Sequence, residues 1–100
     1  MAVEVAEAAA ILHGVHLAIQ SGYSYIVVES NSLNVISYLR LRSPPISEVG
    51  LIILDILSLC SSIEVVFQFA PRGANSVVHC LAQFSFNVVD VVVWREVVPP

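Results

Sequence analysis

The chain has 100 residues, which is enough for one small domain. Hydrophobic residues make up 57% of it and charged residues only 12%, so it has ample apolar surface to bury and disorder is excluded. It contains no lysine, and its four arginines stand against eight acidic residues for a net charge of -4. This charge lacks the basic footprint that most nucleic-acid binders show.

The two cysteines, Cys60 and Cys80, form no C-x-x-C motif, and the sequence has no N-x-S/T glycosylation sequon. With no secretory signal, we expect reduced thiols in an intracellular protein of the nucleus or cytoplasm. Acidic residues interrupt the apolar runs before any reaches the roughly 18 residues of a membrane span, so no membrane partner is expected.

The first half of the chain predicts a helix, a strand and a second helix. Apolar residues at spacings of three and four predict a helix over 4–20, and Gly22 is expected to end it in a left-handed conformation. The nearly continuous apolar run at 23–29 predicts a strand covered on both faces. A helix over 32–41 follows, and a Ser-Pro-Pro sequence ends it because proline cannot continue a helix.

The second half predicts a helix over 47–60, a strand over 63–70, a last helix over 74–86 and an extended tail at 88–100. The order is α-β-α-α-β-α plus a tail, and helices between the two strands imply a parallel pair joined by helical crossovers. Two parallel strands are too few for an independent sheet. We therefore expect that strands are missing, that a partner supplies them, or that the tail adds one.

A polar cluster, Glu29-Ser30-Asn31-Ser32, follows the first strand at the kind of edge where α/β proteins tend to keep their functional sites. Two interpretations of Asn31 stay open. Its side chain caps the next helix by accepting a backbone N–H near Leu33 or Asn34, or it belongs to a site. Both can hold together.

Several stretches of the sequence, in this order, resemble the ribonuclease H-like domain of plant retroelements, the type associated with reverse transcriptases. They are AEAAAILHGVHLAIQSGY, YIVVESNSLNVISYL, SPPISEVGLIILDI, VVFQFAPRGANSVVHCLAQFS and VVVWREVVPP. The resemblance implies an α/β fold with a five-stranded mixed sheet, and a two-Mg²⁺ site that cleaves the RNA strand of an RNA–DNA hybrid. Because the sequence begins at the family's first helix, we expect one N-terminally truncated domain over 1–100, lacking the first three strands of the fold.

The resemblance also assigns the candidate catalytic residues. The family's helix glutamate matches Glu7, its second aspartate matches Asn31, and its last acidic position falls on His79. Glu7 is then a metal ligand, Asn31 a neutral metal ligand and His79 a proton-shuttling group. Since one carboxylate does not hold two divalent ions at a useful affinity, we expect a weakly active or inactive relative of the hybrid ribonucleases.

In the resembling family, the loop that holds Arg72 and Asn75 lies near the nucleic acid, where Arg72 can hold a phosphate with two hydrogen bonds. Simpler interpretations stay open for these candidates. Glu7 can be a solvated acid at a helix start, Arg72 a turn residue, and His79 part of a solvated polar face with Asn75 and Gln83.

A second hypothesis belongs to another functional class. With strands missing, the strand at 23–29 would present an open edge, and the chain would be a non-catalytic interaction module that pairs or self-associates through it. The net charge of -4 favours this hypothesis over nucleic-acid binding.

Overall fold

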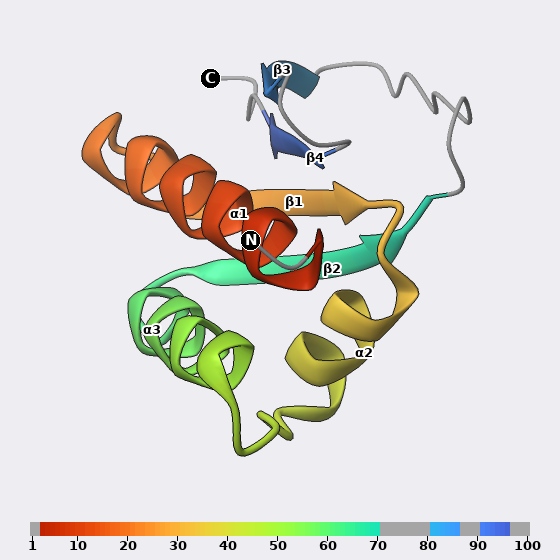
Figure 1. Cartoon of the computed structure of the whole chain (residues 1–100). Helices are drawn as coiled ribbons and strands as arrows, with labels where there is room; N and C mark the ends of the chain where they lie inside the picture. The colour runs from red at the N-terminus through yellow and green to blue at the C-terminus, as the bar shows by residue number, and fades with distance from the viewer. Residues whose placement is uncertain (1–2, 71–80, 87–90, 97–100) are drawn as a thin grey trace.

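The computed structural model describes residues 3–70 in full and the backbone of 81–86 and 91–96 (Figure 1). The elements in chain order are α1 (Val3–Gln20), β1 (Tyr25–Ser30), α2 (Leu33–Leu41), α3 (Glu48–Cys60), β2 (Glu64–Phe69), β3 (Leu81–Phe86) and β4 (Val91–Glu96). The first five agree with the predicted elements to within about two residues at each end. None of the described helices is both long enough and apolar enough to span a bilayer.

The strands form one sheet in the order β2-β1-β4-β3. β1 and β2 are parallel, with Ile26 opposite Val65, and α2 and α3 lie between them in sequence, so the predicted parallel pair with helical crossovers is confirmed. β4 runs antiparallel to β1, with Ile26 opposite Arg95, and β3 runs antiparallel to β4. The predicted extended tail therefore adds a strand. The sheet has more than two strands, and a sheet of only two would be marginally stable in water.

One predicted element is wrong over its second half. Residues 81–86 form strand β3 instead of the end of a helix over 74–86; residues 74–80 lie outside the described residues. The physical reason is the ladder that β3 forms with β4 along its whole length. A partner strand supplies the backbone hydrogen bonds that a helix would otherwise make within itself, and such tertiary pairing overrides a local apolar period.

The expectation of an open edge at 23–29 is also wrong, because β1 is paired on both sides. The outer strands of the described sheet are β2 and β3. β4 returns from the far end of the chain and occupies the side of β1 that was expected to stay open.

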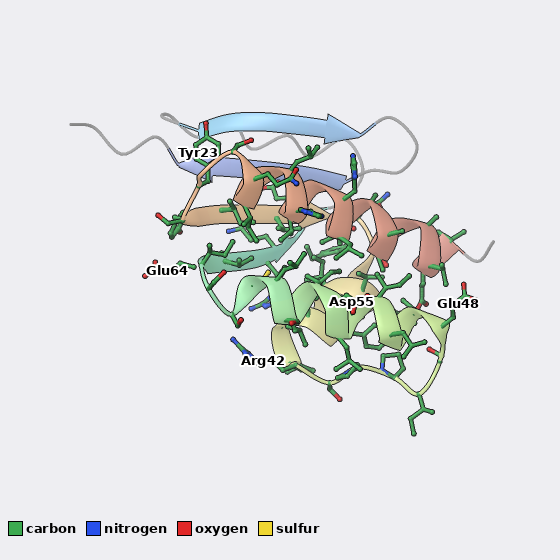
Figure 2. All side chains as sticks on the ribbon, turned by 90° about the vertical axis from the view of Figure 1, so that its left-hand side faces the viewer. Tyr23, Arg42, Glu48, Asp55 and Glu64 are labelled. Carbon is green, nitrogen blue, oxygen red and sulfur yellow. The ribbon has the colours of Figure 1, made fainter. Side chains whose placement is uncertain are left out.

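The core lies between the sheet and the helices, where α1 and α3 pack against each other (Figures 1 and 2). Alternate residues of β1, Ile26 and Val28, are fully buried against it. The helices contribute residues spaced three and four apart, and full burial of each valine, leucine or isoleucine among them stabilises the fold by about 1.5–3 kcal/mol. The buried apolar residues of the helices are Val5, Ala8, Ile11, Val15, Ala18, Val35, Ile36, Leu39, Val49, Ile53 and Ile56.

Two helix ends turn through the left-handed region. Gly22 has φ 89, which confirms its predicted role after α1. Arg42, with φ 52, caps the end of α2 and donates its backbone N–H to the carbonyl of Leu39. The sequence gives no signal for Arg42 because non-glycine residues seldom adopt this conformation.

Candidate functional site

The start of α1 lies beside the start of α2. Glu4 accepts hydrogen bonds from Asn34 Nδ2 at 3.0 Å and from the Tyr38 hydroxyl at 3.5 Å. Because α2 begins directly after β1 ends, these contacts hold the first turns of α1 at the carboxyl end of β1.

Glu7 follows Glu4 on nearly the same face of α1, since residues three apart are neighbours on a helix. It is only 6% exposed, and its Oε2 atom is buried and accepts no hydrogen bond from the described residues. The interpretation of Glu7 as a solvated acid is therefore wrong. A buried carboxylate oxygen without a donor is costly unless a cation or another donor complements it.

Two serines turn the chain from β1 into α2. Ser30 is 1% exposed, and its Oγ accepts the backbone N–H of Ser32 at 3.1 Å. The Oγ of Ser32 accepts the backbone N–H of Val35 at 3.3 Å, so Ser32 is the N-cap of α2. The interpretation of Asn31 as the cap is wrong because the cap residue is the one directly before the first helical residue, Leu33.

Asn31 is half-buried at the point where β1 gives way to α2. Its Oδ1 atom is buried and, like Glu7 Oε2, accepts no hydrogen bond within the described part of the chain. Glu29 lies two residues earlier on the strand, and its side chain is on the sheet face opposite to that of Ser30, because successive strand residues alternate. The polar cluster of the sequence is thus divided between two faces.

Of the residues predicted for the site, Glu7 and Asn31 come from elements that meet at the carboxyl end of β1. Arg72, Asn75 and His79 lie outside the described residues. Within residues 3–70, 81–86 and 91–96, no three His, Cys, Asp or Glu side chains are grouped to hold a metal ion.

Sequence reasoning missed the contacts of Glu4 with Asn34 and Tyr38, which join α1 to α2. The available signal was weak: Glu4 stands three residues before Glu7 and so shares its helix face. Nothing local in the sequence connects Glu4 to residues of the next helix.

A comparison with protein-family models matches residues 1–85 to the reverse transcriptase-like family. Searches of the curated proteins and of the solved structures found no match. The family match covers α1, both parallel strands, α2 and α3, and it confirms the resemblance to a ribonuclease H-like domain. The chain therefore belongs to the reverse transcriptase-like family, and its α/β fold is that of a ribonuclease H-like domain.

Proposed function

We propose that the chain is a nucleic-acid-binding domain related to RNA–DNA hybrid endoribonucleases, in which hybrid cleavage is weak or absent. The observation that carries the proposal is the Glu7 carboxylate, buried beside the carboxyl end of β1 with an oxygen that accepts no hydrogen bond from the described residues. Burial of such a group is costly and is retained where a site needs it.

The oxygen donors of Glu7 and Asn31 fit one Mg²⁺ ion, because Mg²⁺ prefers oxygen ligands and is commonly held by one or two carboxylates together with waters and substrate phosphates. They do not fit a two-ion site, since Asn31 offers a neutral oxygen where the related enzymes use a carboxylate. A bound Mg²⁺ ion would supply charge stabilisation beside a phosphodiester. The Glu7 carboxylate would bind the ion through its negative charge, and the neutral Asn31 oxygen would help to position the ion.

The remaining proposed roles come from the family resemblance. Arg72 would clamp a phosphate oxygen pair, Asn75 would contact the nucleic acid beside it, and His79 would hold or move a proton. With a net charge of -4, we expect the affinity for nucleic acid to be modest and to rest on few phosphate contacts.

The first experiment measures binding of a labelled RNA–DNA hybrid by fluorescence anisotropy at several salt concentrations, with duplex DNA of the same sequence as the comparison. We expect the hybrid to bind more tightly and its affinity to fall as salt rises. A folded protein that binds neither nucleic acid at low salt would contradict the proposed function.

The second experiment adds Mg²⁺ and follows both hybrid cleavage and thermal stability. Wild-type cleavage should stay near background, and Asn31→Asp should raise the apparent Mg²⁺ affinity about tenfold, because it restores a negative ligand. Gln68→Glu is the matched control, since it makes the same amide-to-carboxylate change at an exposed position of β2. Strong Mg²⁺-dependent cleavage that disappears in Glu7→Gln would overturn the claim of weak activity.

A second candidate function, an interaction module that pairs through a sheet edge, is favoured by the outer position of β2. The N–H groups of Glu64 and Ala70 donate to the carbonyls of Ser24 and Ser30 on the β1 side. The residues between them alternate in direction, so Phe69 directs its backbone N–H away from β1. A strand of another chain can pair with this side.

The test compares Phe69→Pro with Phe69→Ala. Both lose the aromatic ring, but only proline loses an outward N–H of the edge strand. If β2 pairs with another copy, Phe69→Pro should weaken self-association more than Phe69→Ala in analytical ultracentrifugation. Equal behaviour of the two variants would exclude edge pairing at β2.

A further inference from the structure

Helix α3 exposes two leucines on its outer face, where Asp55 and Ser58 are also exposed. Val49, Ile53 and Ile56 are buried. On the opposite side, Leu51 is 66% and Leu54 is 51% exposed. A surface helix normally carries mainly polar residues on that side, so the two exposed leucines are unusual there.

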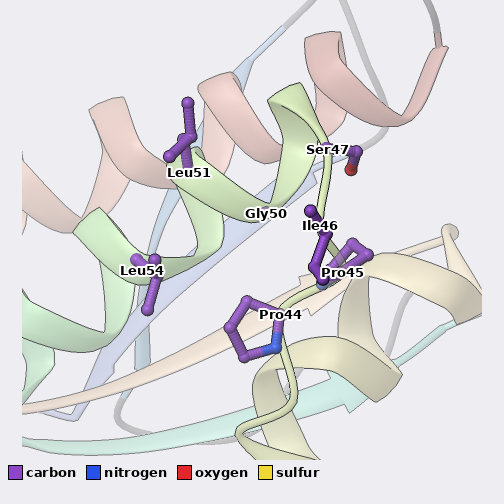
Figure 3. Close-up of a pocket in the computed structure, with 7 residues that line it drawn as sticks. All are labelled: Pro44, Pro45, Ile46, Ser47, Gly50, Leu51 and Leu54. Atoms are coloured by element: carbon purple, nitrogen blue, oxygen red, sulfur yellow. The ribbon is translucent and has the colours of Figure 1, made fainter.

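The loop before α3 extends this apolar surface. Ile46 is fully exposed, and the prolines Pro44 and Pro45 precede it. We call the surface made by these three residues with Leu51 and Leu54 the α3 outer face. Its residues, with Ser47 and Gly50, line an open hollow of about 560 Å³ between the loop and the helix (Figure 3).

Gly50 fixes the shape of this hollow. It is buried, and a Cβ atom at this position would overlap the carbonyl oxygen of Pro45, so only glycine allows the loop to approach the helix so closely. The backbone N–H of Ser47 donates to the same carbonyl at 3.0 Å. The proline loop therefore lies close against the first turn of α3 at Gly50.

The charges at the two ends of α3 are opposite. Glu48 opens the helix, and Arg42 lies near its last turn, where its charge acts on the Cys60 thiol. Figure 2 shows Arg42 and Glu48 toward opposite ends of α3. A second α3 placed antiparallel would bring Arg42 against the partner's Glu48, and the two-fold axis would repeat that pair.

We propose that the α3 outer face is the interface between two copies of this chain, which pack α3 against α3 in antiparallel orientation. Leu51 and Leu54 enter the proline-lined hollow of the partner subunit at the centre, and the charged ends pair at the rim. The antiparallel arrangement also sets the two helix dipoles in opposite directions. Monomeric proteins rarely leave large contiguous apolar surfaces in water, which is the reason that this face needs a cover.

The occupant that fits this surface is another protein face and not nucleic acid. Phosphate backbones are bound by clusters of basic side chains, and the centre of the α3 outer face is aliphatic and proline-rich. A second copy offers the required apolar surface together with a reversed order of charges, and closed two-fold pairs are the commonest assembly of soluble chains.

Sedimentation velocity over a concentration series tests the apolar part of the proposal. We expect a monomer–dimer equilibrium, and we expect Leu51→Gln with Leu54→Gln to raise the dissociation constant at least tenfold. Leu33→Gln is the control, because Leu33 is 58% exposed on α2, away from the α3 outer face. Circular dichroism confirms that each variant folds.

A charge exchange tests the orientation. Arg42→Glu and Glu48→Arg should each weaken the dimer about threefold to tenfold, and the double variant should restore the wild-type constant, because the pair is re-formed with its signs reversed. A chain that stays monomeric at every concentration, a dimer unaffected by the two leucine changes, or a double variant no tighter than the single ones would overturn the proposal.

Discussion

The carboxyl end of β1 and the α3 outer face depart from the usual distribution of polarity in opposite directions. At the first, Glu7 and Ser30 are 6% and 1% exposed; at the second, Leu51 is 66% exposed. Buried polar groups and exposed apolar patches are the informative exceptions in a folded protein. The hydroxyl of Ser30 accepts a hydrogen bond within the chain. In contrast, Glu7 Oε2 accepts no hydrogen bond from the described residues, and Leu51 and Leu54 are left exposed by them. These latter positions are where a ligand or partner would act.

The largest effect is expected from adjacent residues on the two sides of α3. Ile53→Ala should destabilise the fold by about 2–5 kcal/mol because it leaves a cavity in the core. Leu54→Ala should change the free energy of unfolding of the monomer by less than about 0.5 kcal/mol. Chemical denaturation at low protein concentration measures both. Similar losses for the two variants would show that the outer face is packed within one chain.

At the other region, Glu7→Leu should stabilise the protein by about 1–2 kcal/mol, because an apolar side chain replaces a buried oxygen that lacks a donor. It should also abolish any stabilisation by Mg²⁺ in thermal unfolding. Glu4→Leu is the matched control and should destabilise by about 1 kcal/mol, since it removes the acceptor for Asn34 and Tyr38. A loss of stability in Glu7→Leu would mean that the carboxylate is already complemented.

A smaller effect is expected at the start of α2. Ser32→Ala should cost about 1 kcal/mol because the backbone N–H of Val35 loses its acceptor. Ser32→Thr keeps the hydroxyl and should cost much less. Urea denaturation measures the loss of stability in each variant. An equal loss in Ser32→Ala and Ser32→Thr would show that the Ser32 hydroxyl does not cap α2.

A further effect concerns Cys60 and the pH dependence of stability. Burial raises the pKa of the Cys60 thiol from 9.0 to about 11, and the nearby Arg42 guanidinium partly opposes the shift. The unfolded thiol therefore ionises first, so this contribution to stability is complete below pH 9 and is lost as the pH rises toward 11. Denaturation midpoints of the wild type and Cys60→Ala across this range should converge. Parallel pH profiles of the two proteins would exclude the linkage.

The helices and the parallel strands were predictable because their signals are local. Apolar spacing within a window of about 11–18 residues reports one face of a helix or one strand, and that face is the one the core requires. Strand β3 was not predictable in this way, because its conformation depends on a ladder with β4 that no local window contains. The prediction of an open edge at residues 23–29 was wrong for the same reason, because the partner strand β4 lies far along the sequence.

At the candidate site, the prediction of the residue that caps α2 was wrong by one position. Placing the cap at Asn31 instead of Ser32 is within the ordinary uncertainty of helix boundaries. Glu7 was found only through the family resemblance, since an acid near a helix start is common. Its burial follows from the packing of α1 over the sheet, which is a tertiary property and leaves no mark on the neighbouring sequence.

The return of β4 to the side of β1 has a consequence for how the chain folds as it is made. Ile26 is paired with Arg95, far along the sequence, so the side of β1 that faces β4 stays unpaired until β4 has left the ribosome. Contacts between such distant residues require closure of a long loop and slow the final step of folding. During synthesis this apolar strand would be a natural contact for chaperones, and the pairing of β4 would end that exposure.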